Sequence, residues 1–258
     1  MNVLVVGAGA MGRWFAEAMN CDLAFTDANP AVAEHAAEEL GGNAVALDTT
    51  ETFDAVCIAV PLPAVEGAIE EHASKAERAV LDLTGAMAAP VSAMAAHAPD
   101  KERVSLHPLF SPENAPGNVA VVADEPGTVT DDLLSALESR GNTLVETTPD
   151  EHDEAMETVQ AGAHTAILAF ALSANSVPEG LRTPIYDGLA DLTAQVTGGD
   201  SRVYADIQAA FDGSDGVATA ATELAAADPK EFERLYQEAR ATQNATLNQG
   251  EHEPEDER

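Results

Sequence analysis

A glycine-rich turn near the start of the chain holds the first residues whose spacing could do chemistry. Gly7, Gly9 and Gly12 have the GxGxxG spacing, after the apolar run Asn2–Val6 and at the opening of a helical pattern over Met11–Met19. In this setting the first glycine permits a tight turn, the second lets the backbone approach a pyrophosphate, and the third lets the helix pack closely on the sheet. The alternative, a glycine turn without a ligand, is disfavoured by the strand and helix around it. The predicted dinucleotide contacts are Gly7, Ala8, Gly9, Ala10, Met11 and Gly12.

An acidic residue after the second β-type run indicates which dinucleotide binds. Asp27 follows Gly7 by twenty residues. A carboxylate there can accept hydrogen bonds from both hydroxyls of an adenosine ribose, and it repels a 2′-phosphate. The next residues, Ala28 and Asn29, include no Arg that could bind such a phosphate. Asp27 therefore favours NAD over NADP, and a second role in capping the helix that begins at Pro30 is compatible with this one.

His107 is the candidate for proton transfer. It lies in the segment Ser105–Pro112 (SLHPLFSP), directly after a β-type run of the same predicted sheet. The carboxyl ends of strands in such a sheet border the ligand crevice, and Pro108 restricts the backbone that follows the imidazole. A histidine beside a nicotinamide can accept a proton from a hydroxyl while a hydride leaves the substrate. The residues alone leave a purely structural role for this histidine open.

The order of these and later motifs resembles the prephenate and arogenate dehydrogenases of tyrosine biosynthesis. LHPLFSP is similar to that family's HPMFGP segment, and EHDEAMETVQAGAHTAILAFAL to its EHD…IQALRH stretch. The glycine motif occurs in many families, whereas the histidine segment combined with the EHD helix distinguishes this one. The resemblance covers most of the chain in order, through Val5–Phe15, Ile58–Leu62, Leu106–Pro112, Glu151–Leu172, Pro184–Tyr186 and Tyr204–Ile207.

The resemblance implies an oxidative decarboxylation. In the family, the histidine that matches His107 helps remove the proton of the substrate's C4 hydroxyl while a hydride passes to the nicotinamide. Loss of CO2 then gives 4-hydroxyphenylpyruvate from prephenate, or tyrosine from arogenate. For His164, which the resemblance places among the substrate contacts, the alternative is a packed or solvent-facing histidine without a functional role. The resemblance implies substrate contacts at Thr84, Gln160, His164, Tyr186 and Gln195, and cofactor contacts at Val60 and Pro61.

The chain departs from the family pattern where the substrate is anchored. The family has an Arg directly after PIY and another eight positions later, which holds a substrate carboxylate; here these positions are Asp187 and Gln195. Its DxxSVK segment stands here as DLTGAM, in which Gly85 replaces the Ser and Met87 the Lys. Thr84 could supply a hydroxyl from a neighbouring position. These departures affect substrate identity more than fold or cofactor.

A dianionic substrate needs a cation, because burying an unpaired carboxylate is costly. Arg is the usual partner of a carboxylate, since it can bind both oxygens. Arg202, two residues before Tyr204, and Arg182, four before Tyr186, are the candidates. We expect Arg202 to hold the substrate, and a surface position is the alternative for either residue.

The elements that must position these residues alternate between β-type runs and helical patterns. This alternation predicts a doubly wound, mainly parallel sheet of the Rossmann type. The expected strands are Asn2–Val6, Asp22–Thr26, Asn43–Leu47, Ala55–Val60, Ala79–Leu83, Val104–Leu106, Val119–Ala123 and Thr143–Glu146. The expected helices are Met11–Met19, Pro30–Leu40, Leu62–Ala73, Ala88–His97 and Asp131–Arg140.

After Thr148 the β-type runs stop and Ala-, Glu- and Leu-rich stretches with helical spacing follow. Pro149 opens a helix that is expected to reach about Asn175, and later prolines and glycine pairs divide the rest into shorter helices. The predicted fold class is α/β, an N-terminal Rossmann sheet followed by an all-α C-terminal domain. The predicted divisions are a dinucleotide-binding domain over 1–148, a helical substrate and dimerisation domain over 149–248, and an acidic tail over 249–258.

The composition excludes several classes of partner. The 258 residues include 45 Asp and Glu against 12 Lys and Arg, a formal net charge of −33. So acidic a surface repels nucleic acid and anionic membranes. The acids are scattered between regular apolar segments, which favours a folded protein adapted to concentrated salt over an acidic interaction protein. Cys21 and Cys57 lie in no metal-type spacing, and the first residues lack a signal-peptide pattern, so a cytoplasmic protein without a metal site is expected.

Three functions remain to be separated. The first is an NAD-dependent prephenate dehydrogenase, with arogenate dehydrogenase as its variant, acting on a small molecule as a homodimer. The second is a non-catalytic NAD-binding protein of the same fold, which the missing Arg and Ser favour and the retained His107, Gln160 and His164 disfavour. The third is a related reductase that acts on an imine or a β-hydroxyacid. Such enzymes use a helical-domain lysine or a different base, and none of Lys75, Lys101 and Lys230 fits such a site.

Overall fold

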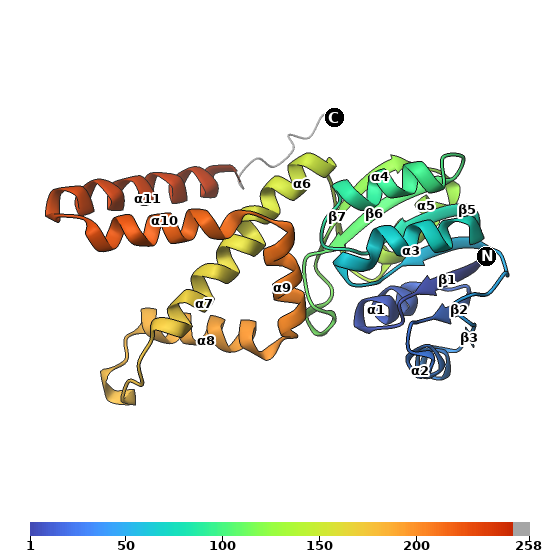
Figure 1. Ribbon diagram of the computed structural model, residues 1–258, viewed down its shortest axis with the longest axis horizontal. Helices are drawn as coiled ribbons and strands as arrows, with labels where there is room; N and C mark the ends of the chain where they lie inside the picture. Colours follow the sequence, from blue (N-terminus) through green and yellow to red (C-terminus); the bar gives the residue numbers. More distant parts are fainter. Residues whose placement is uncertain (250–258) are drawn as a thin grey trace, which may run out of the picture.

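The β-type runs of the first 146 residues form one sheet in the computed structural model, which describes residues 1–249 (Figure 1). The strand order is β3-β2-β1-β4-β5-β6-β7-β8, and all neighbours are parallel except β6 and β7. Residues 250–258 of the expected acidic tail lie outside the described residues. The strands are β1 Asn2–Val6, β2 Asp22–Thr26, β3 Asn43–Ala44, β4 Phe53–Ile58, β5 Ala76–Asp82, β6 Glu102–Pro108, β7 Asn118–Glu125 and β8 Thr143–Glu146.

Helices cover both faces of this sheet because the strands carry apolar side chains on both sides. Val3 and Val5 of β1 pack against α1, α2 and α5, whereas Leu4 and Val6 pack against α3 and α4. The doubly wound architecture is therefore confirmed. These helices are α1 Ala10–Ala18, α2 Pro30–Leu40, α3 Val65–His72, α4 Ala88–His97 and α5 Thr128–Ser139.

Several expected elements differ from the observed ones in their bounds, and two of the differences have a clear physical cause. The strand expected over Asn43–Leu47 is only two residues long, because β3 is an edge strand whose residues are exposed and pair on one side only. The helix expected from Asp131 begins three residues earlier, where Glu102 of β6 accepts hydrogen bonds from the backbone of Val129 and Thr130. A side chain from a distant strand thus caps that helix.

The second half of the chain is helical, as predicted, and extends away from the sheet (Figure 1). Its first helix is not uniformly α-helical as expected: α6 and α7 are joined by a π-helical segment, η4, that holds one extra residue per turn. A small cluster of Met156, Ala161, Ile207 and Phe211 packs α6, η4 and α9 together. The elements are α6 Pro149–Met156, η4 Glu157–Gly162, α7 Ala163–Ser173, α8 Pro184–Gly198, α9 Ser201–Ala210, α10 Gly213–Ala226 and α11 Pro229–Gln249.

Among residues 1–249, none of the helices combines the length and the apolar character that crossing a bilayer requires.

Candidate active site

The glycine turn between β1 and α1 has the close packing that the motif predicts. Gly7 has φ +92°, and a Cβ on it would lie 2.3 Å from the Ala59 carbonyl oxygen at the end of β4. A Cβ on Gly12 would lie 2.1 Å from the carbonyl oxygen of Gly7, so the helix could not approach the strand with any other residue there. Gly9 differs, because a Cβ on it would meet nothing within 4 Å. The open space over Gly9 is where a pyrophosphate would lie against the backbone.

Asp27 is tied to this turn. Its carboxylate accepts hydrogen bonds from the backbone N–H of Ala8, at 3.0 Å, and of Asn29, at 2.8 Å. The cap of α2 is Asn29, whose side chain accepts from the Ala31 N–H, so Asp27 does not cap that helix itself. Each carboxylate oxygen keeps a free lone pair. The end of β2 therefore presents acceptors beside the glycine turn, as binding a ribose would require.

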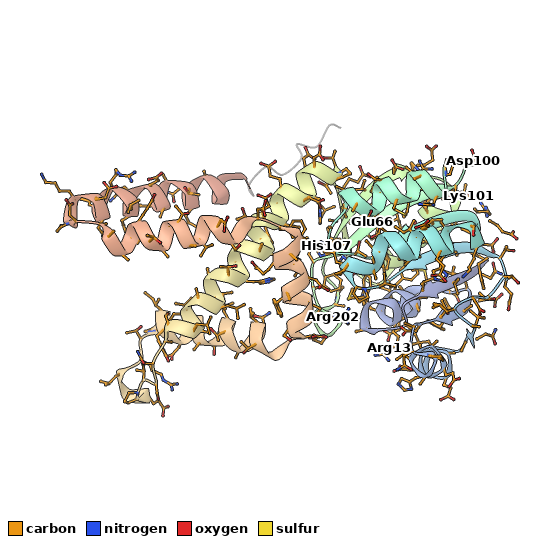
Figure 2. All side chains as sticks on the ribbon, viewed as in Figure 1. Arg13, Glu66, Asp100, Lys101, His107 and Arg202 are labelled. Carbon is orange, nitrogen blue, oxygen red and sulfur yellow. The ribbon has the colours of Figure 1, made fainter. Side chains whose placement is uncertain are left out.

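His107 lies near the carboxyl end of β6, at the junction between the sheet and the helical half (Figure 2). Its side chain is buried, with 7% of the residue exposed. The following loop is fixed by Phe110, whose ring packs edge-on against Trp14 of α1 at 5.4 Å. Gly85 lies beside the imidazole, since a Cβ on it would be 3.5 Å from the His107 Nε2. Because the residue is glycine, no side chain covers that nitrogen from this direction.

A chain of hydrogen bonds connects His107 to a carboxylate on α6. His107 Nδ1 lies 2.9 Å from His152 Nε2, and His152 Nδ1 lies 2.8 Å from Asp153 Oδ1. Asp153 also accepts from the backbone N–H groups of Met87, at 2.9 Å, and Ala88, at 3.1 Å, where α4 begins. The carboxylate thus binds the first turn of a helix of the sheet half and an imidazole of the helical half at once.

The direction of these bonds follows from the acceptor at the end. An ionised carboxylate only accepts, so His152 carries its proton on Nδ1 and its Nε2 accepts from the Nδ1–H of His107. The His107 Nε2 is then an acceptor, 3.3 Å from the side-chain nitrogen of Gln160. In this tautomer the single lone pair of Nε2 accepts from the Gln160 amide, and it becomes available to a substrate hydroxyl, as a general base requires, when that amide turns aside.

Burial sets the charges of this group. Desolvation, together with the nearby His152, lowers the pKa of His107 to about 3, so His107 is neutral at ordinary pH. Burial alone would raise the pKa of Asp153, but hydrogen bonds from His152, Met87 and Ala88 outweigh it and hold that pKa below its usual value. His107 is therefore a neutral base, connected through His152 to the ionised carboxylate of Asp153.

Thr84 does not offer its hydroxyl as the sequence led us to expect. The side chain is buried and donates to Asp82 Oδ2 at 2.5 Å, and its backbone N–H donates to the same oxygen. Burial raises the pKa of Asp82 to about 6, although the hydrogen bonds from Thr84 oppose the shift. Thr84 therefore holds a buried carboxyl at the end of β5, and its hydroxyl hydrogen is already used there.

Gln160 and His164 line the same junction from the helix that includes η4 and α7. The Gln160 Oε1 and the His164 Nδ1 are both buried without a hydrogen-bond partner among the described residues. The His164 ring packs edge-on against Tyr204 of α9 at 4.8 Å, and burial lowers its pKa. Leaving such atoms unpaired is costly, so both are available to hydrogen-bond a polar ligand or a water at this junction.

The remaining predicted contacts do not all meet at His107. Tyr186 packs against Phe170 at 5.9 Å in the first turn of α8, which begins at the end of the helical half far from the sheet (Figure 1). Arg182 precedes the same helix and lies 5.9 Å from the Tyr186 ring. Gln195 is exposed toward the other end of α8. Within one chain, the structure thus brings neither Tyr186 nor Arg182 to His107.

Arg202 has a different position. It lies in the first turn of α9, at the junction between the two halves in the view of Figure 2. Its guanidinium is exposed and makes no ion pair with the side chains of residues 1–245. Of the two candidate cations, Arg202 is therefore the one that the fold leaves available to an anion near the site.

Sequence reasoning missed His152 and Asp153 as members of the site. Both stand in the EHD stretch that carried the family resemblance, but a position in the first turns of a helix gives no sign of facing a strand residue 45 positions earlier. The available signal was the pair of adjacent titratable residues directly after the Thr148–Glu151 capping box.

Comparisons with known proteins point to one family. Residues 16–124 match the family described as "Prephenate dehydrogenase, nucleotide-binding domain". The chain is similar over 232 residues to the 4-amino-4-deoxyprephenate dehydrogenase of Streptomyces pristinaespiralis, at 31% identity, which covers 82% of this chain and 78% of the relative. It is 24% identical to a probable arogenate/prephenate dehydrogenase of Methanocaldococcus jannaschii, covering 80% of this chain and 50% of that protein.

The fold has a solved counterpart. Prephenate dehydrogenase of Aquifex aeolicus, in complex with hydroxyphenyl propionate and NAD+, superposes with a TM-score of 0.67 at 16% identity, over 98% of this chain and 92% of that one. At that identity the likeness supports the fold, an α/β Rossmann-like sheet followed by a helical region. Family membership rests on the 31% identical relative, most of whose length the chain covers. The chain belongs to the prephenate/arogenate dehydrogenase family of oxidoreductases.

Proposed function

We propose that the protein catalyses the NAD-dependent oxidative decarboxylation of prephenate to 4-hydroxyphenylpyruvate, in tyrosine biosynthesis. The observation that carries this proposal is the unprotonated Nε2 of His107, held by His152 at the junction between the nucleotide-binding turn and the helical half. A base in that position can take the proton of a C4 hydroxyl on a ring placed beside the nicotinamide. Residues 1–148 then serve as the dinucleotide domain and 149–248 as the substrate and dimerisation domain.

The reaction requires the residues of the chain to position the substrate and to supply one base. His107 accepts the hydroxyl proton at Nε2, and Gln160 supports the same oxygen from the other side, because its amide already lies 3.3 Å from that nitrogen. When bound, the nicotinamide accepts the hydride that leaves C4. Loss of CO2 aromatises the ring and supplies the driving force, so positioning and one base are sufficient.

NAD, and not NADP, is the proposed cofactor. The space over Gly9 fits a pyrophosphate, and Val60 and Pro61 follow β4 at the same edge of the sheet as Gly7. The carboxylate of Asp27 would accept from the ribose hydroxyls and repel a 2′-phosphate. Titration with both nucleotides tests this, and tighter binding of NADP would contradict it.

Arg202 is proposed to hold a substrate carboxylate. We expect Arg202→Gln to raise the KM for prephenate by about tenfold or more with little change in kcat, since a hydrogen bond to a charged group contributes about 1.5–3 kcal/mol. Steady-state kinetics measures this. Arg182→Gln is the matched control; a raised KM in that variant alone would transfer the role to Arg182.

A second candidate substrate is 4-amino-4-deoxyprephenate, on which the Streptomyces relative is named to act. The unpartnered Oε1 of Gln160 favours it, because a C4 amine has a further N–H to donate to that oxygen while a hydroxyl has one hydrogen only. Arogenate is a third, and the acidic Asp187 and Asp191 would suit its ammonium group.

One set of assays separates these functions. NADH formation and CO2 release are measured with prephenate, 4-amino-4-deoxyprephenate and arogenate in turn, in molar KCl because the net charge of −33 indicates adaptation to concentrated salt. The highest kcat/KM identifies the substrate. NAD binding without turnover of any of the three would favour a non-catalytic nucleotide-binding protein instead.

The helical half is proposed to form a homodimer. α7 is rich in apolar residues yet none of its residues is buried, and Leu172 at its end is 89% exposed while Ile185 of α8 is 80% exposed. Apolar surface of this extent marks an interface. We expect Leu172→Asp to shift the protein from dimer to monomer in sedimentation, whereas Glu223→Gln, on the exposed face of α10, leaves it a dimer. A wild-type protein that sediments as a monomer would contradict the proposal.

A further inference from the structure

The base His107 is weak where the structure places it. Burial and the neighbouring imidazole of His152 leave it with little tendency to hold a positive charge, and its pKa is lowered to about 3. A base that cannot keep the proton it accepts would return it to the hydroxyl before the hydride leaves. The positive charge must therefore be stabilised elsewhere.

His152, one hydrogen bond away from His107, offers such a place. His152 is 3% exposed, and its two ring nitrogens are each hydrogen-bonded, one to His107 at 2.9 Å and one to Asp153 at 2.8 Å. The groups that face it are His107 on β6, Asp153 on α6 itself and the buried Asp82 on β5, so two of the three are carboxyl groups. A proton on His152 is thus next to an ionised carboxylate, where a charge-assisted hydrogen bond stabilises it.

The hydrogen bonds from Gln160 to Asp153 all have their donors on the same side. Gln160 donates to His107, His107 to His152, and His152 to Asp153, and donors aligned in sequence polarise one another. Asp153 is itself held by two backbone N–H groups at the start of α4. These two bonds fix the orientation of the Asp153 carboxylate, and the carboxylate in turn fixes the imidazole of His152.

We propose that His152 and Asp153 form a proton relay behind His107, in which His152 holds the proton during hydride transfer. The proposal rests on the proposed function. As the C4 hydrogen leaves with its electron pair, the hydroxyl proton moves to His107 Nε2 and the His107 Nδ1 proton moves to His152 Nε2. When the bond to CO2 breaks, its electron pair enters the ring, and both protons move back to give the phenol. No proton is gained or lost overall.

His152→Gln tests the relay against a role in orientation alone. The Gln side chain reaches about as far as Nε2, so its oxygen can still accept from the His107 Nδ1–H, but an amide cannot be protonated. The relay predicts that kcat falls roughly 10²-fold or more, as when the carboxylate of a catalytic triad is removed. A variant with wild-type kcat would overturn the relay and leave His152 a positioning residue.

Asp153→Asn provides a second readout, the pH profile. Removing the carboxylate makes a protonated His152 less stable, so the acidic limb of kcat/KM should move to lower pH while the plateau falls. A role in holding α4 alone would lower the plateau, or the thermal stability, without moving the limb, and that result would count against the relay. Glu154→Gln on the same helix is the matched control, since it removes an equal charge from an exposed position.

One measurement separates failure of the relay from failure of the proposed function. Imidazole 15N NMR of the unliganded protein reports the tautomers without any turnover. The relay requires protons on Nδ1 of both His107 and His152, whether or not prephenate is the substrate. A proton on the His107 Nε2 would overturn the relay, while absence of turnover with the required tautomers would overturn the proposed substrates only.

Discussion

Replacing His107 with Asn should lower kcat by roughly 10²–10⁴-fold, the usual contribution of a general base. The Asn amide reaches about as far as Nδ1, so it can keep a hydrogen bond to His152, but it places no atom at Nε2. The variant therefore removes the Nε2 lone pair, together with its hydrogen bond from Gln160, and little else. NADH formation in the steady state measures the effect.

NAD affinity should stay nearly unchanged in that variant, because the described contacts of His107 include neither the glycine turn nor Asp27. The single tryptophan, Trp14, lies in α1 directly after the turn, so its fluorescence can report nucleotide binding. His97→Asn makes the same substitution at an exposed position at the end of α4 and serves as the control. Undiminished turnover in the His107 variant would remove this residue from the mechanism.

The second large effect is expected at the glycine turn, where two alanine substitutions should have different consequences. Gly12→Ala should destabilise the fold by about 1–3 kcal/mol, the usual cost of overpacking, and weaken NAD binding as well, because its Cβ would lie 2.1 Å from the Gly7 carbonyl oxygen. Gly9→Ala should leave the unfolding temperature unchanged, since its Cβ meets nothing within 4 Å.

Gly9→Ala should nevertheless weaken NAD binding about tenfold or more, close to 1.4 kcal/mol, because the methyl group would occupy the space proposed for the pyrophosphate. Thermal unfolding and nucleotide titration of the two variants give the comparison. Equal loss of stability in both would mean that the turn is only structural, and full NAD affinity in the Gly9 variant would place the pyrophosphate elsewhere.

Much of the sheet half could be predicted because its local signals agree with the fold. β1, β2 and β8 and helices α2 and α4 have the predicted bounds, since each is an apolar run or pattern bounded by turn residues or a cap. The antiparallel pairing of β6 and β7 could not be predicted in the same way. Strand direction depends on the connection between strands, and the loop between these two contains no helix long enough for a parallel crossover.

The site shows the same division. Gly7, Gly12 and His107 could be identified because the chemistry of each is local to its own motif. The role of Thr84 could not be predicted, because its hydroxyl is used by a carboxyl two residues away inside the fold. The contact between His152 and His107 depends on how α6 docks on the end of β6, which is a matter of tertiary packing and not of spacing along the chain.

The π-helical segment η4 has a consequence for how relatives of this protein can diverge. A π segment differs from an α-helix by one inserted residue, and deleting it would rotate everything that follows by about 100°. Residues before η4 belong to the proton-transfer group, and residues after it carry the apolar surface of α7. Gly213 of α10 has no room for a Cβ, which would lie 1.8 Å from the Glu157 carbonyl oxygen, so the segment is tightly enclosed. A single insertion or deletion in η4 would therefore reorient the apolar surface of α7 relative to His152 and Asp153, and would move His164 with it.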